Sequence, residues 1–248
     1  MRAGPLASGR VWGIEEPGVL DRLLVVSPHL DDAVLSCGAL LLEHPGATVA
    51  TLFAASPPAY TDPLNEHDTD CGYQPGDDTM AVRREEDVRA MSAVGAASHW
   101  LPLCQNSHVD RADPIAVPAG AVDAIVAAIA EVDPTCVVAP LGLAHVDHQA
   151  CHASALSARA IADAVPWLWY SDLPYVFIPG VLAARFRALH RLGLTASPAC
   201  PVVSRDGDAK WRAFTEYTTQ VAVLERLWQL RERLERAAES YWTLDSSG

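Results

Sequence analysis

Short apolar runs alternate along the chain with longer segments whose apolar residues recur at helical spacing. The first run, residues 23–26 (LLVV), has no polar alternation, which indicates a strand covered on both faces, as in a parallel sheet. A helix-like segment over 33–43 and a second apolar run over 47–55 follow it. This β-α-β pattern predicts a pair of parallel strands joined by a right-handed crossover.

The same pattern continues along the rest of the chain and predicts further strands and helices. The expected strands cover 99–103, 135–141, 167–172 and 200–204, and the expected helices cover 79–93, 119–131, 146–162, 182–190, 208–217 and 221–240. No linker, repeat or low-complexity tract divides the chain, so we expect a single α/β domain with a mostly parallel sheet flanked by helices. Its expected limits are residues 21–242, with an N-terminal lead-in over 1–20 and a polar tail over 243–248.

Two long polar segments, 56–78 and 105–118, interrupt this alternation. Each follows a predicted strand, so both are expected at the edge where the strands end. Loops of this length in a compact domain are commonly functional, and we interpret 56–78 as a lid or substrate loop. On the second segment, we interpret His108 and Asp110 as surface polar residues, with contact to the substrate as the alternative.

Composition narrows the classes of partner. The chain has 248 residues and a formal charge of −13, without a basic cluster, which argues against nucleic-acid binding. Its six cysteines form no CxxC pair, and a chain of this size does not need disulfides for stability, so we expect no disulfide framework. The sequence shows no signal peptide and no apolar run of bilayer length, so we expect a cytoplasmic protein without membrane contact. The oligomeric state stays open, a homo-oligomer included.

Polar residues that can bind a metal or move a proton follow the first predicted strand at once: His29, Asp31 and Asp32. A strand end that leads into a helix start is where open α/β sheets place their chemistry. One interpretation is that the two aspartates merely cap the helix, since Asp is a favourable N-cap residue. A second cluster favours a chemical role.

This second cluster, His145, Asp147 and His148, follows the strand predicted at 135–141. In a parallel sheet, both clusters lie at the same edge. Two imidazoles and a carboxylate, from His29, Asp32 and His148, suit Zn²⁺ with a fourth position left for water, and the same ligands also suit Fe²⁺.

Three further residues complete the parts that amide hydrolysis needs. Asp31 is placed to take the proton of a metal-bound water, and His145 to stabilise the oxyanion or protonate the leaving amine. Asp147 is placed to orient a ring N–H of a ligand. His152 stands one helical turn after His148, but we expect it to pack rather than to bind the metal. No Ser or Cys nucleophile motif and no glycine-rich phosphate loop is present.

The segments Pro28–Ala33 (PHLDDA) and His145–His148 (HVDH) together resemble the two-part signature of the PIG-L/LmbE-like zinc-dependent deacetylases. The Arg83-x-x-Glu86 and Tyr217-x-x-Gln220 patterns extend the resemblance. It implies a Rossmann-like three-layer fold. It also implies that His29, Asp32 and His148 bind zinc, that Asp31 is the general base, that His145 stabilises the tetrahedral intermediate, and that Arg83 contacts the substrate.

The chain departs from the family pattern at three positions. Leu30 and Ala33 stand where the common motif has Pro and Glu, and the missing Glu removes an acid close to the ligands. Leu143 stands where some sugar-thiol members carry Tyr, so one electrophilic group is missing there.

We therefore predict a metal-dependent N-deacetylase whose partner is a small-molecule acylated amino sugar or similar glycoside, with an N-acetyl group as the expected acyl group. One alternative is an amidase that acts on thiol-sugar conjugates of the mycothiol type. Two others are a non-catalytic Rossmann-like binding module and a degenerate relative that binds zinc without turnover.

Overall fold

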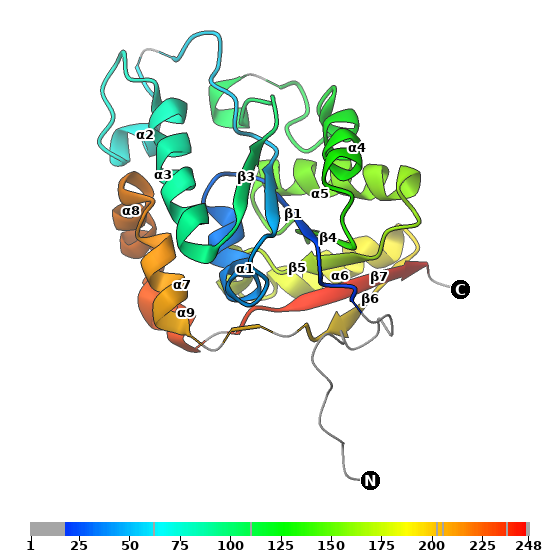
Figure 1. Cartoon of the computed structure of the whole chain (residues 1–248). Helices are drawn as coiled ribbons and strands as arrows, with labels where there is room; N and C mark the ends of the chain where they lie inside the picture. The colour runs from blue at the N-terminus through cyan, green and yellow to red at the C-terminus, as the bar shows by residue number, and fades with distance from the viewer. Residues whose placement is uncertain are drawn as a thin grey trace.

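The computed structural model describes residues 18–61, 63–109, 111–201, 203–204, 206–236 and 238–246. In these residues a seven-stranded sheet has the strand order β3-β2-β1-β4-β5-β7-β6 (Figure 1). The first five strands of this order pair in parallel. Strand β7 pairs antiparallel with β5 on one side and with β6 on the other. The strands are β1 Leu23–Ser27, β2 Thr48–Thr51, β3 Ala97–Trp100, β4 Cys136–Pro140, β5 Trp167–Tyr170, β6 Leu194–Ala199 and β7 Tyr241–Ser246.

The order of the strands creates a crevice at the carboxyl ends of β1 and β4. From β1 the chain proceeds outward to β2 and β3, whereas from β4 it proceeds in the opposite direction to β5. Loops that leave two neighbouring strands in opposite directions separate, and open α/β sheets bind ligands at this point. The fold therefore marks the ends of β1 and β4 as the place to look for a site.

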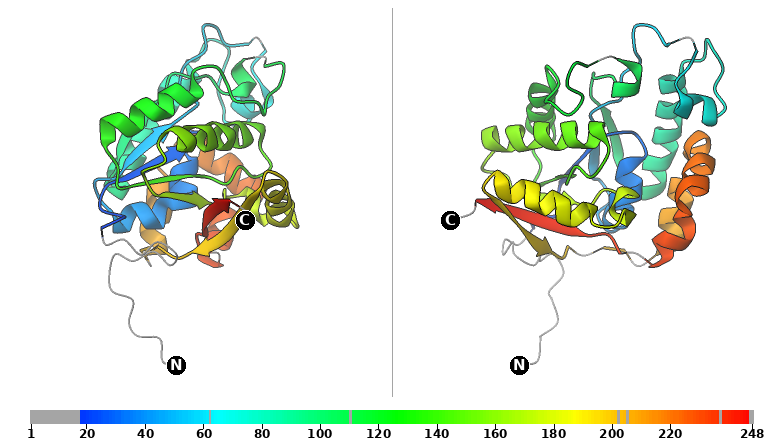
Figure 2. Two further views of the ribbon diagram at one scale, coloured as in Figure 1. Left: turned by 90° about the vertical axis from the view of Figure 1, so that its right-hand side faces the viewer. Right: turned by 180° about the vertical axis from the view of Figure 1, so that it is seen from behind.

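Helices cover both faces of the sheet, which gives three layers (Figure 2). Alternate side chains of β1 enter two separate cores, with Leu23 and Val25 on one face and Leu24 and Val26 on the other. This confirms the single Rossmann-like α/β domain. Among the described helices, none combines the length and hydropathy that a bilayer span requires. The first face carries α1 Asp32–Glu43, α3 Thr79–Val94, α7 Gly207–Phe214, α8 Thr218–Trp228 and α9 Leu230–Arg236, and the second carries α4 Ala121–Val132, α5 Val146–Ile161 and α6 Val181–Arg191.

The prediction of a polar tail over 243–248 is wrong for 243–246, because these residues complete β7 between β5 and β6. In this strand only Tyr241 and Leu244 are buried. Its sequence therefore lacks the apolar run that marks a strand covered on both faces. Residues 247–248 and residues 1–17 of the expected lead-in lie outside the described residues.

Two other predictions near the C-terminus are also corrected. The strand expected at 200–204 lies instead at Leu194–Ala199, an edge strand in which only Ala199 is buried, so its sequence lacks the apolar run of a buried strand. The single helix expected over 221–240 is two helices, α8 and α9, which Gln229 separates with a left-handed φ of 52°. The spacing of apolar residues alone does not reveal a break of this kind between two helices.

The two long loops reach the same edge of the sheet as the crevice. The 56–78 loop contains a short helix, α2 Glu66–Asp70, which lies beside α8 (Figure 1). Nε2 of His67 in α2 lies 2.8 Å from Oε1 of Gln220 in α8. The 105–118 loop contains a 3-10 turn over Asn106–His108.

Candidate metal centre and active site

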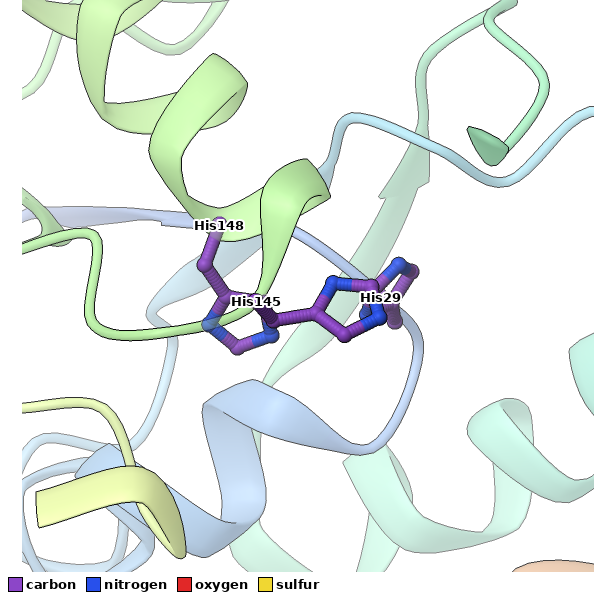
Figure 3. A group of neighbouring side chains, drawn as sticks. All are labelled: His29, His145 and His148. Carbon is purple, nitrogen blue, oxygen red and sulfur yellow. The ribbon is translucent and has the colours of Figure 1, made fainter. Parts of the chain in front are cut away.

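The loops that follow β1 and β4 meet at the crevice between these strands. Leu23 lies opposite Cys136 in the parallel register, so the two strands end at similar heights. His29 comes from the loop after β1, and His145 and His148 come from the start of α5 after β4 (Figure 3). Each of these imidazoles offers a nitrogen, and the three nitrogens lie within 4.8 Å of one another. The two clusters recognised in the sequence thus converge in space.

Asp32, at the start of α1, lies between two of these imidazoles. Its Oδ2 atom is 3.1 Å from Nδ1 of His29 and 3.0 Å from Nε2 of His148. Nε2 of His148 is buried and has no hydrogen-bond partner, because its approach to Asp32 lacks hydrogen-bond geometry. Ligands of one metal ion lie about 3 Å apart without bonding to each other. The donor set of His29, Asp32 and His148 therefore fits a divalent cation.

Two carboxylates orient the imidazoles of this donor set. Nε2 of His29 lies 3.1 Å from Oδ2 of Asp147, and Nδ1 of His148 lies 2.6 Å from Oδ1 of Asp172. A carboxylate only accepts, so each of these nitrogens carries its ring proton. When the rings are neutral, as metal ligation requires, the opposite nitrogens, Nδ1 of His29 and Nε2 of His148, have a lone pair on the side of Asp32.

The carboxylates also dominate the electrostatics of the donor set. Burial disfavours a charge on His29, but hydrogen bonds to Asp147 and Asp32 outweigh it and raise the pKa of His29 to about 9. For His148, burial is outweighed by Asp32 and Asp172, and its pKa rises to about 10. Burial would raise the pKa of Asp32, but the two imidazoles hold it well below its usual range. The site therefore holds negative charge that a cation can balance.

His145 differs from the other two imidazoles in its hydrogen bonding. Its Nδ1 accepts the backbone N–H of Asp147 at 3.2 Å, so in the neutral ring the proton sits on Nε2. Burial, together with the charges that His29 and His148 carry when protonated, lowers the pKa of His145 to about 3. His145 is thus a neutral hydrogen-bond donor at pH 7, which suits oxyanion stabilisation better than metal ligation.

Asp31 is the carboxylate that the sequence predicts to stay off the metal, and no other residue in the described part of the chain donates a hydrogen bond to it. It occupies the N-cap position of α1, but its side chain makes no capping hydrogen bond. Burial and the adjacent charge of Asp32 raise the pKa of Asp31 to about 6. The interpretation of Asp31 as a mere helix cap is therefore wrong, and its carboxylate faces the same cavity as His29 and His145.

This cavity, of about 360 Å³, opens in front of the donor set. One wall is polar and includes His67, Gln105 and Gln220. Other lining residues form an apolar wall. They include Leu35, Met80, Leu224, Leu227 and Trp228. The cavity can therefore hold an amphipathic molecule beside the ligands.

Arg83 lies in the polar wall, as expected for a residue on the substrate side. Its guanidinium also donates to Oδ1 of Asp68 at 2.6 Å, and Oδ2 of Asp68 lies 2.9 Å from Nε2 of His108. His108 is 8% exposed, so its interpretation as a surface residue is wrong. Asp110 lies outside the described residues. Arg83 thus enters the cavity wall as part of a buried ion pair that also fixes the 56–78 loop.

The supporting motif residues connect α3 to α8 and α1. Glu86 accepts hydrogen bonds from Thr218 and from the backbone of Thr219. The hydroxyl of Tyr217 donates to the carbonyl oxygen of Leu30, within the first signature segment. These contacts hold the walls of the cavity together.

Sequence reasoning missed the role of Asp172, which stands two residues after the end of β5. The Asp172 carboxylate is fully buried and accepts the backbone N–H groups of Gly142 and Leu143 at 2.9 and 3.1 Å, in addition to its contact with His148. The available signal was an acidic residue shortly after a third parallel strand. Because β5 is parallel to β4, it ends at the same edge of the sheet as β1 and β4. Asp172 therefore supports a ligand and the loop that carries it.

Arg111 of the 105–118 loop was also missed. Its guanidinium donates to Oδ1 of Asp147, and the backbone N–H of Asn106 lies 3.0 Å from Oδ2 of the same carboxylate. The ring of Phe53 lies under the guanidinium, 4.9 Å away. These contacts link the 105–118 loop to Asp147, the acid that orients His29. No short sequence motif indicates them.

The departures from the family pattern are apolar positions here. Ala33 and Leu143 are at most 1% exposed and pack in the two cores. His152 packs as expected, with Nδ1 2.9 Å from the carbonyl oxygen of Pro140 and its ring against Trp169.

Gly142→Ala is expected to destabilise the fold by about 2–4 kcal/mol, because a side chain there combines left-handed strain with overpacking. Gly142 has φ +79°, and an added Cβ would lie 2.7 Å from Cβ of His152 and 3.1 Å from the carbonyl oxygen of His148. The matched control is Gly180→Ala, at φ +80° with nothing within 4 Å. Denaturant unfolding measures both, and equal losses would contradict the packing argument.

A comparison with models of protein families identifies the family of this chain. The sequence model of PIG-L, described as GlcNAc-PI de-N-acetylase, matches residues 24–159, which is more than half of the chain. The chain therefore belongs to the PIG-L family, which confirms the resemblance. A search of curated proteins gives no match.

Solved structures of deacetylases are similar over nearly the whole chain. The "antimicrobial reagent A40926 pseudoaglycone deacetylase Dbv21" is 28% identical, with a TM-score of 0.74 over 92% of this chain and 98% of that one. A teicoplanin-biosynthesis deacetylase in complex with teicoplanin is 26% identical, with a TM-score of 0.71 over 92% and 99%. The zinc-inhibited form of teicoplanin deacetylase Orf2 is 25% identical, with a TM-score of 0.73 over 91% and 98%. Family and relatives support a hydrolytic N-deacetylase that acts on amino-sugar substrates.

Proposed function

We propose that this protein is a zinc-dependent deacetylase that removes the N-acetyl group of an amino sugar carried on a glycopeptide aglycone. The observation that carries the proposal is the donor set of His29, Asp32 and His148 with one unengaged carboxylate, Asp31, beside it. Support for the substrate class comes from the relatives named above, which are a deacetylase of the A40926 pseudoaglycone and a deacetylase in complex with teicoplanin.

The residues divide the work of amide hydrolysis. His29, Asp32 and His148 would hold Zn²⁺, which when bound polarises the amide carbonyl and acidifies water. Asp31 takes the proton of the attacking water and returns it to the leaving nitrogen. The Nε2–H of His145 donates to the amide oxygen as negative charge develops on it.

Asp147 and Asp172 do not touch the substrate in this scheme. They keep His29 and His148 in the tautomers that direct a lone pair at the cation. Sugar hydroxyls meet the polar wall at Arg83 and Gln220, and the apolar wall meets the aromatic surface of the aglycone.

The test is acetate release from the A40926 pseudoaglycone with its amino sugar N-acetylated. N,N′-diacetylchitobiose and an acylated thiol-sugar conjugate serve as competing substrates, and mass spectrometry reports loss of the acetyl group. Bound metal is removed with a chelator, and one equivalent of Zn²⁺ is then added. Excess Zn²⁺ is avoided because one relative, teicoplanin deacetylase Orf2, has a zinc-inhibited form. Fe²⁺ under anaerobic conditions tests the other metal that these ligands suit.

The expected result is release from the glycopeptide, loss of activity on stripping and recovery on reloading. Activity that survives complete removal of metal would reject the metal-dependent mechanism. Preference for the thiol-sugar conjugate would reject the substrate class.

A further inference from the structure

Tyr175 lies in the cavity that the donor set and Asp31 also line, although the proposed mechanism does not use it. It belongs to the 3-10 turn Tyr175–Phe177 that follows β5. The same segment carries Asp172, whose carbonyl oxygen accepts the backbone N–H of Val176 at 2.9 Å. The segment that orients His148 therefore also places an aromatic side chain at the site.

Three rings fix the position of the Tyr175 side chain. It stacks on His145 with ring centroids 5.8 Å apart and an interplanar angle of 29°. It meets His148 edge-on at 4.9 Å and Trp228 edge-on at 5.9 Å. A ring held by partners on several sides has little rotational freedom, so its hydroxyl has a defined position.

The Tyr175 hydroxyl differs from those of the other tyrosines. A tyrosine hydroxyl that leaves water normally finds a partner. Among the described residues, none forms a hydrogen bond with the Tyr175 hydroxyl, although its side chain is half-buried. The five other tyrosine hydroxyls all donate hydrogen bonds, namely those of Tyr60 to Asp78, Tyr73 to Thr219, Tyr170 to Val26, Tyr217 to Leu30 and Tyr241 to Glu239.

We propose that Tyr175 is a catalytic residue whose hydroxyl donates a hydrogen bond to the oxygen of the scissile amide, beside Nε2–H of His145. Two neutral donors on adjacent stacked rings then share the charge that develops on this oxygen. Tyr175 keeps its proton throughout. This inference rests on the proposed function, because it assigns a further role in the same hydrolysis.

The kinetic test is Tyr175→Phe, which keeps the ring stack and removes only the hydroxyl. We expect kcat to fall about 100-fold with KM within about twofold, as for an interaction made in the transition state alone. The melting temperature and the zinc content should stay at the wild-type values. Tyr241→Phe is the matched control. It removes a hydroxyl whose hydrogen bond Glu239 accepts, so the stability of the protein should fall. Because Tyr241 is not a lining residue of the cavity, kcat should be retained.

A binding test is independent of turnover. Methylphosphonate is a tetrahedral anion that imitates the charged oxygen of the reacting acetyl group. We expect it to bind the zinc-loaded Tyr175→Phe protein about 10-fold more weakly than the wild type, as measured by calorimetry. This result together with absence of deacetylation on every glycoside would support the role of Tyr175 and reject the proposed function. Wild-type kcat and wild-type methylphosphonate affinity in Tyr175→Phe, or a rise in KM alone, would overturn the inference.

Discussion

Asp31→Asn is expected to lower kcat for acetate release by about 10³-fold, the contribution typical of a positioned general base. The Asp31 carboxylate is unengaged and faces the cavity, and its pKa of about 6 lets it accept a proton near neutral pH. An amide of the same size cannot accept that proton. Because Asp31 is not in the donor set, zinc content and melting temperature should match those of the wild type.

The measurement is single-turnover acetate release, with zinc quantified in the same protein samples. Asp123→Asn, an exposed residue in the first turn of α4, is the control for loss of one negative charge. If Asp31→Asn retains more than a tenth of the wild-type rate, another group is the base. If it loses zinc in proportion to activity, Asp31 is a ligand instead.

Asp172→Asn is expected to weaken zinc binding by about 10- to 100-fold, the usual cost of removing a carboxylate that orients a ligating histidine. The two backbone N–H groups of Gly142 and Leu143 would keep the Asn oxygen, so its NH₂ group would face Nδ1 of His148. His148 would then carry its proton on Nε2, the nitrogen directed at Asp32, and could not ligate in that form.

Competition of each variant with a chromophoric chelator measures this affinity, and unfolding with and without zinc reports the coupled stability. Asp172→Ala leaves three buried donors unpaired, so it should also lower the stability of the zinc-free protein by about 3 kcal/mol. Unchanged zinc affinity in Asp172→Asn would show that the tautomer of His148 does not depend on this acid.

The site was largely predictable because its residues stand in two short segments, each directly after an apolar run. Residues 23–26 and 135–141 indicate buried parallel strands, and the polar clusters at His29 and His145 follow them. Parallel strands end at one edge, so a local pattern was enough to bring both clusters to the same side of the sheet. The motifs then implied the ligands and the unengaged acid.

Other parts of the prediction failed where the physical signal is not local. Strands β6 and β7 at the antiparallel side bury only some of their residues, so the sequence placed the first at 200–204 and took residues 243–246 as part of a polar tail. Asp172 and Tyr175 belong to no sequence motif. They reach the site only because β5, which precedes them, pairs with β4. Arg111 reaches Asp147 across a loop whose course the sequence does not encode in any short pattern.

By itself, then, the sequence determined the fold class, the family and the chemical identity of the donor set, because side-chain period and residue type are local properties. Only the tertiary structure decided that β1 and β4 are neighbours, which acids hold the ligands in their tautomers, and that Tyr175 lines the cavity. Those features depend on pairing and packing between segments far apart in the chain. The spatial order of the strands in the sheet likewise depends on how all the elements pack together.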